Sequence, residues 1–432
     1  MLALKRARPD RYPFLLESTA AGGSARYSIL FAFPGETLAL APCGVLTGPG
    51  AAETGAGFLD ALDNWWRRER IAPASGLPFR GGWFVYLGYE LAAQIETLPL
   101  PPTDSALPTA FATRIPAAIV FDRARGTFEP VAEAGRGDLL DVLRDDLAHP
   151  FELPESPWLP CPMSEEPPER YLDMVTRARE YILAGDVFQV NLARTWRGEL
   201  PASVKPADIY ARLRQANPAP FAGLADCGTG TIISSSPERL VRVIGRRVET
   251  RPIAGTRPRH TDAARDAALI RELLENAKER AEHVMLVDLE RNDLGRIAAT
   301  GSVRVDEMMA TESYAHVHHI VSNVSAMLNP ETTPGAVIRA VFPGGTITGC
   351  PKVRCMEIIA ELEGARRGAY TGAMGYLNRD GDMDLNILIR TLVVENGTVS
   401  LHAGAGIVAD SVPVRELEET RAKARGMLAS LE

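Results

Sequence analysis

Apolar residues in the first third of the chain gather in short runs of the kind that form β-strands. Residues 26–33, 81–90 and 117–122 are apolar continuously or in alternation, and Gly or Pro lies near their ends. Runs of about four to eight such residues between turn signals are typical of strands. The pattern predicts that residues 1–150 form a mainly β region.

A stretch rich in proline follows this region. Seven prolines lie between Pro150 and Pro168, and each fixes its own φ and removes a backbone hydrogen-bond donor. We interpret the stretch as a linker, so that the chain divides into residues 1–150 and residues 165–432.

Helices and strands mix after the linker. Residues 168–184 place apolar side chains on one helical face, and Gly185 follows as a C-cap. These elements predict an α+β fold in which large, mostly antiparallel sheets are flanked by helices. The further elements that we expect are a strand at 187–193, a long helix from Thr261 or Asp262 to Leu294 that is interrupted near Asn292, strands within 372–394 and 398–406 with a hairpin turn at 379–382, and a final helix that starts at Pro413 and runs to the C-terminus.

Composition and charge exclude several classes of protein. The chain has 432 residues, of which 46% are hydrophobic and 24% are charged, and its net charge is −8. These values lie close to the globular averages of about 45–50% and about 25%, so disordered, fibrous and disulfide-scaffold proteins are excluded. The acidic balance gives no reason to expect a nucleic acid as partner.

The chain also lacks the usual signals of membrane insertion and secretion. No run approaches the roughly 20 apolar residues that span a bilayer, and Pro9 and Asp10 stand where a signal peptide needs its apolar region. Five cysteines are an odd number and have no framework spacing. We expect a cytoplasmic protein with reduced thiols and no membrane partner.

Two predicted helices each carry a pair of carboxylates. Glu279 and Glu282 are three residues apart and share a face, as do Glu416 and Glu419 on the last helix. If the helices face one another, the four side chains form a site for a hard cation, for which Mg²⁺ is the natural occupant. Solvated helix faces are the alternative, and Lys423 fits an ion pair with Glu419 or a substrate contact.

Two glycine-rich segments match nucleotide-binding motifs only superficially. Gly404 and Gly406 follow a predicted strand, but too few residues remain for a dinucleotide-binding unit. Gly344 and Gly349 have P-loop spacing, but Cys350 stands where the lysine belongs. Nucleotide binding is therefore not expected, whereas backbone N–H groups near such glycines can bind an anion or simply form a turn.

Three histidines lie close together in the sequence. With strand alternation, His316 and His318 share a face and His319 points the other way, so a three-histidine metal site is geometrically poor. The pattern favours a single acid–base histidine over a metal site, and packing remains the simplest role for any one of the three.

Taken together, the motifs resemble those of the chorismate-binding enzymes. This family includes the large subunits of anthranilate synthase and aminodeoxychorismate synthase, isochorismate synthase and salicylate synthase. The resemblance is dense from Asp186 onwards and looser before residue 150. It is carried by DVFQVNLAR, SSSPERL, PIAGTRPR, AEHVMLVDLERNDLGRI, HHIVS, FPGGTITGCPKVRCMEII, IRT, HAGAGIVADS and ELEETRAKA.

The resemblance implies a fold of two intertwined subdomains with the active site in the cleft between their sheets. It implies that Glu282 and Glu419 bind Mg²⁺ with Glu279 and Glu416 beside them, and that the ion bridges the ring carboxylate of chorismate. It implies that His319 lies near the C4 hydroxyl as an acid for its departure and that Thr346 positions the ring. The groups implied for the enolpyruvyl carboxylate are Tyr370, Arg390, Lys423 and the backbone around Gly404 and Gly406.

Two positions bear on which reaction the resemblance implies. Gln189 stands where isochorismate and salicylate synthases have a lysine general base, and a neutral amide cannot deprotonate water, so amination is favoured over hydration. Ala254, in PIAGT, stands where many aminodeoxychorismate synthases have a nucleophilic lysine. The segments QVNLAR, NPAPFAGL and FPGGTITG nevertheless resemble those enzymes more closely. We therefore expect 4-amino-4-deoxychorismate, made for para-aminobenzoate and folate synthesis, with anthranilate as the alternative product.

The resemblance also implies two partners. Glu17 and Ser18, in FLLES, match the tryptophan pocket of the family, although an ordinary strand edge is the alternative. No cysteine stands in the G-x-C-x-G elbow of a glutaminase nucleophile, so we expect ammonia from a separate glutamine amidotransferase subunit. A catalytically silent subunit that binds chorismate or tryptophan is a further alternative, which the presence of the glutamates and His319 disfavours.

Overall fold

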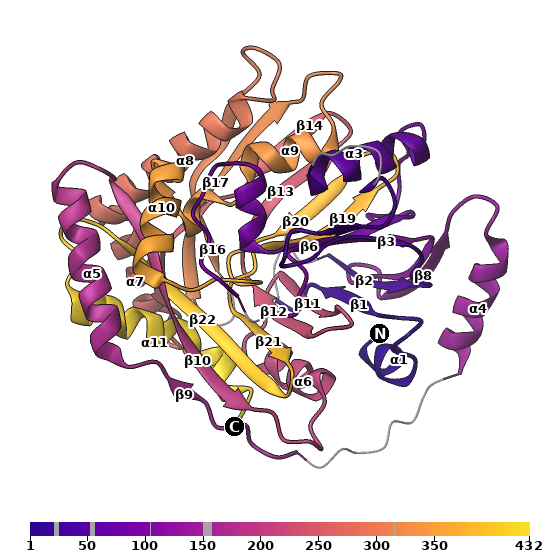
Figure 1. Cartoon of the computed structure of the whole chain (residues 1–432), viewed down its shortest axis with the longest axis horizontal. Helices are drawn as coiled ribbons and strands as arrows, with labels where there is room; N and C mark the ends of the chain where they lie inside the picture. The colour runs from indigo at the N-terminus through magenta and orange to yellow at the C-terminus, as the bar shows by residue number, and fades with distance from the viewer. Residues whose placement is uncertain (21–25, 52–56, 104, 150–157, 314–316) are drawn as a thin grey trace.

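Two large antiparallel sheets pack against each other and carry helices on their outer faces (Figure 1). The computed structural model describes residues 1–20, 26–51, 57–103, 105–149, 158–313 and 317–432. Among these residues each sheet has eleven strands, and neighbouring strands within each sheet are antiparallel. The predicted α+β fold with large antiparallel sheets is confirmed.

The first sheet, sheet A, holds β18 at one edge and β8 at the other. Its strands, in spatial order, are β18 (Gly349–Cys350), β10 (Gln189–Glu199), β22 (Thr398–Ile407), β21 (Thr391–Glu395), β12 (Thr231–Ser236), β11 (Phe221–Asp226), β1 (Phe14–Glu17), β2 (Tyr27–Ala32), β7 (Ala117–Asp122) and β8 (Thr127–Ala132), with β9 (Ser164–Glu165) paired to β10.

The second sheet, sheet B, runs from β15 to β4. Its strands, in spatial order, are β15 (Ile253–Pro258), β17 (Val317–Met327), β14 (Arg247–Thr250), β13 (Arg239–Ile244), β20 (Met383–Asn386), β19 (Ala373–Asn378), β5 (Gly82–Leu87), β6 (Ala110–Ile115), β3 (Thr37–Leu40) and β4 (Leu46–Thr47), with β16 (Arg304–Ser313) paired to β17.

Both sheets contain strands from before residue 150 and from after residue 165, so the two regions of the chain are interleaved in space. The expected boundary stays a prediction, and residues 150–157 lie outside the described part of the chain. The helices are α1 (Leu2–Ala7), α3 (Phe58–Glu69), α4 (Gly137–Ala148), α5 (Pro168–Leu183), α6 (Pro206–Ala216), α7 (Ala263–Glu275), α8 (Ala277–Gly295), α9 (Pro334–Val341), α10 (Lys352–Glu363) and α11 (Pro413–Ala429), and η1 (Tyr89–Gln94) and η2 (Gly345–Ile347) are 3₁₀ turns.

Several predicted helix ends are confirmed. Gly185 follows α5 with φ +87°, Asp262 caps α7 by accepting a hydrogen bond from the Arg265 N–H, and α11 begins at Pro413. The expected interruption near Asn292 is wrong, because α8 continues to Gly295. The break lies at Asn276, whose Oδ1 accepts hydrogen bonds from two N–H groups of the first turn of α8 and so ends one helix and starts the next.

Four apolar clusters hold the layers together. One lies between the sheets, where Phe14 of sheet A stacks on Phe84 of sheet B with ring centroids 4.0 Å apart. A second packs α3, α8 and α9 onto sheet B, and a third packs α4, α6 and α11 onto sheet A. A fourth joins α5 and α10 to β10 and β22, at the end of the molecule where α8 and α11 also lie (Figure 1). No helix in the described part of the chain is both long and apolar enough to cross a membrane.

Candidate functional site

Two of the points at which the chain crosses between the sheets are neighbours in space, and each carries a charged residue. Glu238 lies between β12 of sheet A and β13 of sheet B, and Arg390 lies between β20 of sheet B and β21 of sheet A. The crossings are bonded to each other, because the N–H of Ile387 donates to the carbonyl of Glu238 over 3.0 Å. The segment 372–394 therefore contributes to three strands, of which β19 and β20 belong to sheet B and β21 belongs to sheet A.

Arg390 is held in an unusual backbone conformation at its crossing. Its φ is +55°, a region that non-glycine residues rarely adopt, and its carbonyl accepts a hydrogen bond from the Ser235 N–H over 3.0 Å. Burial lowers the pKa of the guanidinium, and Tyr370, Glu419 and Glu238 nearby act in the opposite direction. Arg390 remains charged, since guanidinium pKa values lie far above neutrality.

Glu238 is a buried carboxyl group that the sequence analysis did not single out. It is 5% exposed, and burial raises its pKa to about 7 despite the nearby charges of Arg390 and Lys423. The hydroxyl of Thr346 lies beside it and favours its charged form, yet makes no hydrogen bond of good geometry to a described residue. That hydroxyl can therefore turn to Glu238 or to a ligand.

The two predicted carboxylate pairs come together beside these crossings. The pKa of Glu282 on α8 is raised, first by burial and then by repulsion from Glu279 and Glu419. The pKa of Glu416 is raised by burial and by Glu419. Burial also disfavours the charged form of Glu419. Its pKa nevertheless lies below the usual value, because Lys423 and Arg390 stabilise that charge. Lys423 Nζ lies 2.7 Å from Glu419 Oε1. The pairs are thus a single electrostatically coupled cluster.

This cluster fits Mg²⁺ by its chemistry. Among the residues that the structure describes, no three His, Cys, Asp or Glu side chains lie close enough to hold a metal by themselves. Mg²⁺ in enzymes is often held by one or two carboxylates, with water and substrate as the other ligands. Buried, mutually repelling carboxylates provide such a set, and Glu282 and Glu419 would be its members.

Glycines let polar side chains converge on the other side of the cluster. A Cβ at Gly404 would lie 2.8 Å from the Tyr370 hydroxyl and 2.8 Å from Asn191 Oδ1, and one at Gly406 would lie 2.2 Å from Gln189 Nε2. Gln189 Nε2 donates to Glu282 Oε1 over 3.0 Å. Only glycine leaves space for these groups, which explains both positions better than a turn does.

Several buried polar atoms around this point make no hydrogen bond within the described structure. They are Gln189 Oε1, Asn191 Oδ1 and Thr346 Oγ1. Leaving such atoms unbonded costs about 1–3 kcal/mol each. The two amide oxygens can accept hydrogen bonds and the Thr346 hydroxyl can donate one. With Lys423, which donates to the Gly404 carbonyl over 2.9 Å, these groups mark a site for a polar ligand that has both donors and acceptors.

An open backbone edge adds donors to this site. Strand β21 pairs with β22 only as far as Leu401, whereas β10 pairs with β22 up to Ile407. Among the described strands, the segment with Gly404 and Gly406 is thus paired on one side only. Backbone N–H groups on the other side can bind a carboxylate.

His319 and His318 lie on β17 and contact different partners. His318 bonds to Asp266 over 2.9 Å and to Ser313 over 2.7 Å, which is a structural role. His319 Nδ1 lies 3.3 Å from the Gly255 carbonyl. A carbonyl can only accept, so Nδ1 carries the hydrogen and Nε2 is the basic nitrogen. Burial lowers the pKa of His319 to about 4, and the ring is neutral at pH 7. His316 lies outside the described residues.

Ala254 lies beside this histidine on the neighbouring strand. It pairs with Ile320, one residue from His319, and it is buried. Its methyl group carries no nucleophile, so this wall of the site is chemically inert.

The predicted tryptophan-pocket residues lie at a separate cavity of about 1110 Å³, which none of the residues named above as Mg²⁺ or chorismate candidates lines. The strand segment with Glu17 and Ser18 forms part of its wall, together with Phe221 and Met374. The Glu17 carboxylate, however, accepts a hydrogen bond from the Tyr210 hydroxyl over 2.8 Å and pairs with Arg214. Ser18 Oγ donates to the Pro220 carbonyl over 2.9 Å.

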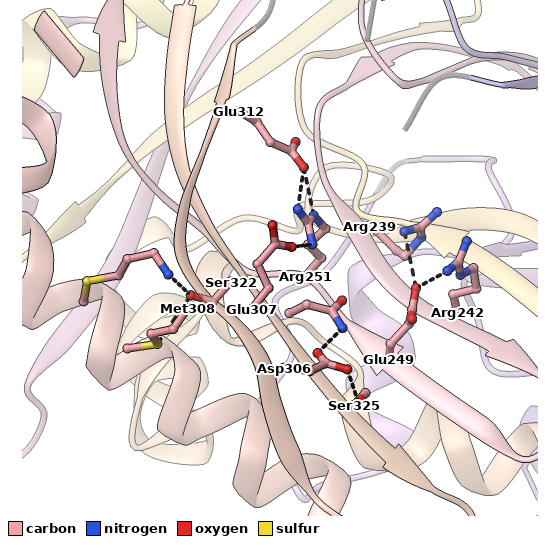
Figure 2. Close-up of polar contacts among 12 residues, drawn as sticks. Arg239, Arg242, Glu249, Arg251, Asp306, Glu307, Met308, Glu312, Ser322 and Ser325 are labelled. Atoms are coloured by element: carbon pink, nitrogen blue, oxygen red, sulfur yellow. Dashed lines mark hydrogen bonds and ion pairs between the residues drawn. The ribbon is translucent and has the colours of Figure 1, made fainter. Parts of the chain in front are cut away.

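Figure 2 shows the charged wall of the same cavity. Arg242 pairs with Glu249 over 2.5 Å, and Arg251 pairs with Glu307 and Glu312 over 2.6 Å each. Each of these charged side chains thus has a partner of opposite sign among the described residues.

Comparisons with known proteins agree with this geometry. A sequence profile described as chorismate binding enzyme matches residues 40–429. Anthranilate synthase component 1 of Thermus thermophilus is 43% identical over 443 residues, which cover 99% of this chain and 94% of the relative. Aminodeoxychorismate synthase component 1 of Bacillus subtilis is 41% identical over 390 residues, which cover 87% and 82%. In the crystal structure of anthranilate synthase component I from Streptococcus pneumoniae the TM-score is 0.84 at 34% identity, with 94% and 93% covered.

Proposed function

Because this chain belongs to the family of chorismate-binding enzymes, we propose that it aminates chorismate with ammonia in the cleft between its two sheets. The observation that carries the proposal is the convergence of Glu238, Arg390 and the carboxylate cluster at the two chain crossings. This arrangement combines a proton donor, an anion-binding cation and a cation-binding face around a site for a small molecule.

The two carboxylates of chorismate match the two halves of the site. The enolpyruvyl carboxylate fits Arg390, the Tyr370 hydroxyl, Lys423 and the open edge of β22, since charged donors bind a carboxylate most strongly. The ring carboxylate would face Glu282 and Glu419, which repel it. When bound there, Mg²⁺ would supply positive charge that offsets this repulsion and attracts the ring carboxylate.

Glu238 is better suited than His319 to protonate the departing C4 hydroxyl. A carboxyl group with a pKa of about 7 is substantially protonated near neutral pH, whereas the imidazole of His319 has a pKa of about 4 and carries no proton to donate from Nε2. We assign the acid role to Glu238. His319 then serves as a hydrogen-bond acceptor that orients the hydroxyl, and Thr346 positions the ring.

The product proposed first is 4-amino-4-deoxychorismate, as made for para-aminobenzoate and folate synthesis. Ammonia forms the new C–N bond, the C4–O bond breaks, and the hydroxyl takes the proton of Glu238 and leaves as water. Because Ala254 offers no nucleophile, water or ammonia would act directly on the ring, without a covalent enzyme intermediate. The segments QVNLAR, NPAPFAGL and FPGGTITG support this product.

Anthranilate is the second candidate product. Ammonia would then add at C2 as the C4 hydroxyl departs. Removal of the C2 proton, together with loss of the enolpyruvyl group, which gains a proton at its methylene carbon and leaves as pyruvate, would make the ring aromatic. Ala254 favours this candidate, as do relatives named anthranilate synthase component 1, among them the Thermus thermophilus protein. In both reactions Glu238 would protonate the departing C4 hydroxyl.

The two expected partners belong to this proposal. A separate glutamine amidotransferase subunit would supply ammonia, since the sequence offers no glutaminase nucleophile. Tryptophan would occupy the cavity between the Glu17–Ser18 and Phe221 segments. The Glu17 carboxylate is already paired with Arg214, so it would shape the pocket from behind.

Mass spectrometry of the products tests the proposal. The purified protein is incubated with chorismate, Mg²⁺ and ammonium, and a second incubation contains tryptophan. A product that keeps the pyruvyl carbons and gains an amine supports 4-amino-4-deoxychorismate. Anthranilate with pyruvate, inhibited by tryptophan, supports the second candidate. No turnover at high ammonium would contradict both.

A further inference from the structure

The buried face of α8 carries acidic residues beyond the carboxylate cluster. Two turns after Glu282, Glu290 is 7% exposed, and Asp293 one turn later is 1% exposed. Acidic side chains are almost never buried without a partner. Neither residue belongs to the predicted metal site, so their burial requires another explanation.

Asp293 is held by two cations: Lys352, which follows the Gly-rich loop 342–351, and Arg296, at the end of α8 itself. Lys352 Nζ, directly after the loop, lies 2.5 Å from Asp293 Oδ2; the side chain of Asp293 is buried and that of Lys352 is 12% exposed. Arg296 donates to Asp293 Oδ1 over 2.6 Å and to the carbonyl of Ala340, before the loop, over 2.7 Å. The loop is thereby tied to α8 at its start and at its end.

The middle of the loop rests directly on α8. A Cβ at Gly345 would lie 2.4 Å from Leu289 Cδ2 and 3.5 Å from Glu290 Oε1, so the helix and the 3₁₀ turn η2 are in close contact. Thr346 lies in that turn. Its buried hydroxyl faces Glu238, and Glu238 and Glu290 interact electrostatically. The loop therefore links Lys352, which follows it and pairs with Asp293, to Thr346, which lies in it beside Glu238.

We propose that Asp293 and Lys352 are positioning residues, which together with Glu290 hold the loop so that Thr346 stays against Glu238 in the cleft. The inference rests on the proposed function for its catalytic consequence. The tie itself is a property of the fold and can be measured without turnover.

The geometry explains why the tie is ionic and buried. The pair of Lys352 and Asp293 adds no net charge. Lys352, which directly follows the loop, also donates to the Val341 carbonyl before the loop over 3.4 Å. One ammonium thus joins both ends of the loop to α8. A loop held at two ends and pressed against a helix keeps few conformations. Catalysis by a positioned acid is sensitive to displacements of about 1 Å.

The test compares Lys352→Met with the wild type and with Arg354→Met as matched control. Arg354 lies in the same first turn of α10, but it is more than a third exposed and pairs with Asp186 and Glu357 on the outside. Each substitution removes one positive charge. Of the two residues, only Lys352 contacts Asp293 and the loop.

Two measurements separate positioning from stability. Amide hydrogen exchange in residues 344–350 is expected to become at least about tenfold faster in Lys352→Met, and to stay unchanged in Arg354→Met. The kcat with chorismate and ammonium is expected to fall about tenfold or more, while KM for chorismate changes less than about threefold, because binding groups stay in place.

A double variant, Lys352→Met with Asp293→Asn, keeps the test decisive if the single variant is unstable. It removes the buried carboxylate that Lys352→Met leaves with Arg296 as its remaining cation, so thermal stability is expected to recover, while kcat and loop exchange are expected to stay altered. Three results would each overturn the inference. The first is recovery of kcat together with stability in the double variant. The others are unchanged amide exchange in the loop and an equal loss of kcat in Arg354→Met. A wild type that exchanges slowly in the loop but does not turn over chorismate would contradict the proposed function alone.

Discussion

Glu238 and Arg390 lie on adjacent crossings between the two sheets, and the Ile387 N–H that bonds to the Glu238 carbonyl joins the two crossings. Strand pairing on both sides fixes each crossing, and among the residues that the structure describes no salt bridge joins the carboxyl group of Glu238 to the guanidinium of Arg390. This leaves both groups to act on a ligand. The fold itself thus places the acid and the anion-binding cation.

Glu238→Gln is expected to lower kcat by about 10²–10⁴-fold, the range that a general acid contributes. The amide keeps the size of the side chain and removes its proton. In the wild type, kcat is expected to fall as pH rises through about 7, because Glu238 is active when protonated. The assay holds free ammonia constant at each pH, since protonation of ammonia would otherwise impose an opposite trend. A pH profile in the variant that is as steep as in the wild type would argue against the assignment.

The same carboxyl group is expected to make folding stability depend on pH. Its folded pKa of about 7 lies above the ordinary value of 4.5, so between these values the folded state binds more protons than the unfolded state. Stability from this group is present below about pH 4.5 and is lost as pH rises towards 7. Relative to Glu238→Gln, the wild type should lose on the order of 1–3 kcal/mol between pH 5 and pH 8. Urea unfolding of both proteins at the two pH values measures the difference, and a constant difference would contradict it.

The sequence predicted most of the elements because their signals are local. The apolar face and Gly185 define α5, and Asp262 and Pro413 mark helix starts. The break between α7 and α8 was also readable, since Asn276 with Glu279 three residues later is a capping pattern. It was missed because apolar and charged residues continue through it without an evident change.

The site was only partly predictable, for a physical reason. Glu282, Glu419 and Arg390 are recognisable from family motifs. Glu238 lies in the family motif SSSPERL, but it gains its raised pKa only because the crossing buries it. Likewise, Lys352 and Asp293 are 59 residues apart, and nothing local shows that each is the partner of the other. Burial and long-range pairing arise from the sheet topology, which no short segment encodes.

Glu282→Gln is expected to reduce turnover by about a hundredfold or more and to weaken the response to Mg²⁺. The amide keeps a hydrogen-bonding oxygen near Gln189 but loses the charge that holds the cation. Initial rates across a Mg²⁺ titration, after treatment with a chelator, measure the effect. Asp288→Asn on the same helix is the control, because that side chain is 62% exposed and pairs with Arg291 on the outside of the helix. Equal Mg²⁺ responses in the two variants would remove Glu282 from the metal site.

Gly404→Ala is expected to raise KM for chorismate by about tenfold or more with a smaller change in kcat, because the added methyl group occupies the point where Tyr370 and Asn191 converge. Both polar groups must move by several tenths of an ångström, and the open edge of β22 moves with them. A loss of carboxylate binding of about 1.4 kcal/mol gives this factor. Gly137→Ala on α4, where an added Cβ meets nothing within 4 Å, is the control. If chorismate affinity is unchanged in Gly404→Ala, the enolpyruvyl carboxylate binds elsewhere in the cleft, and Arg390 rather than the β22 edge would determine its position.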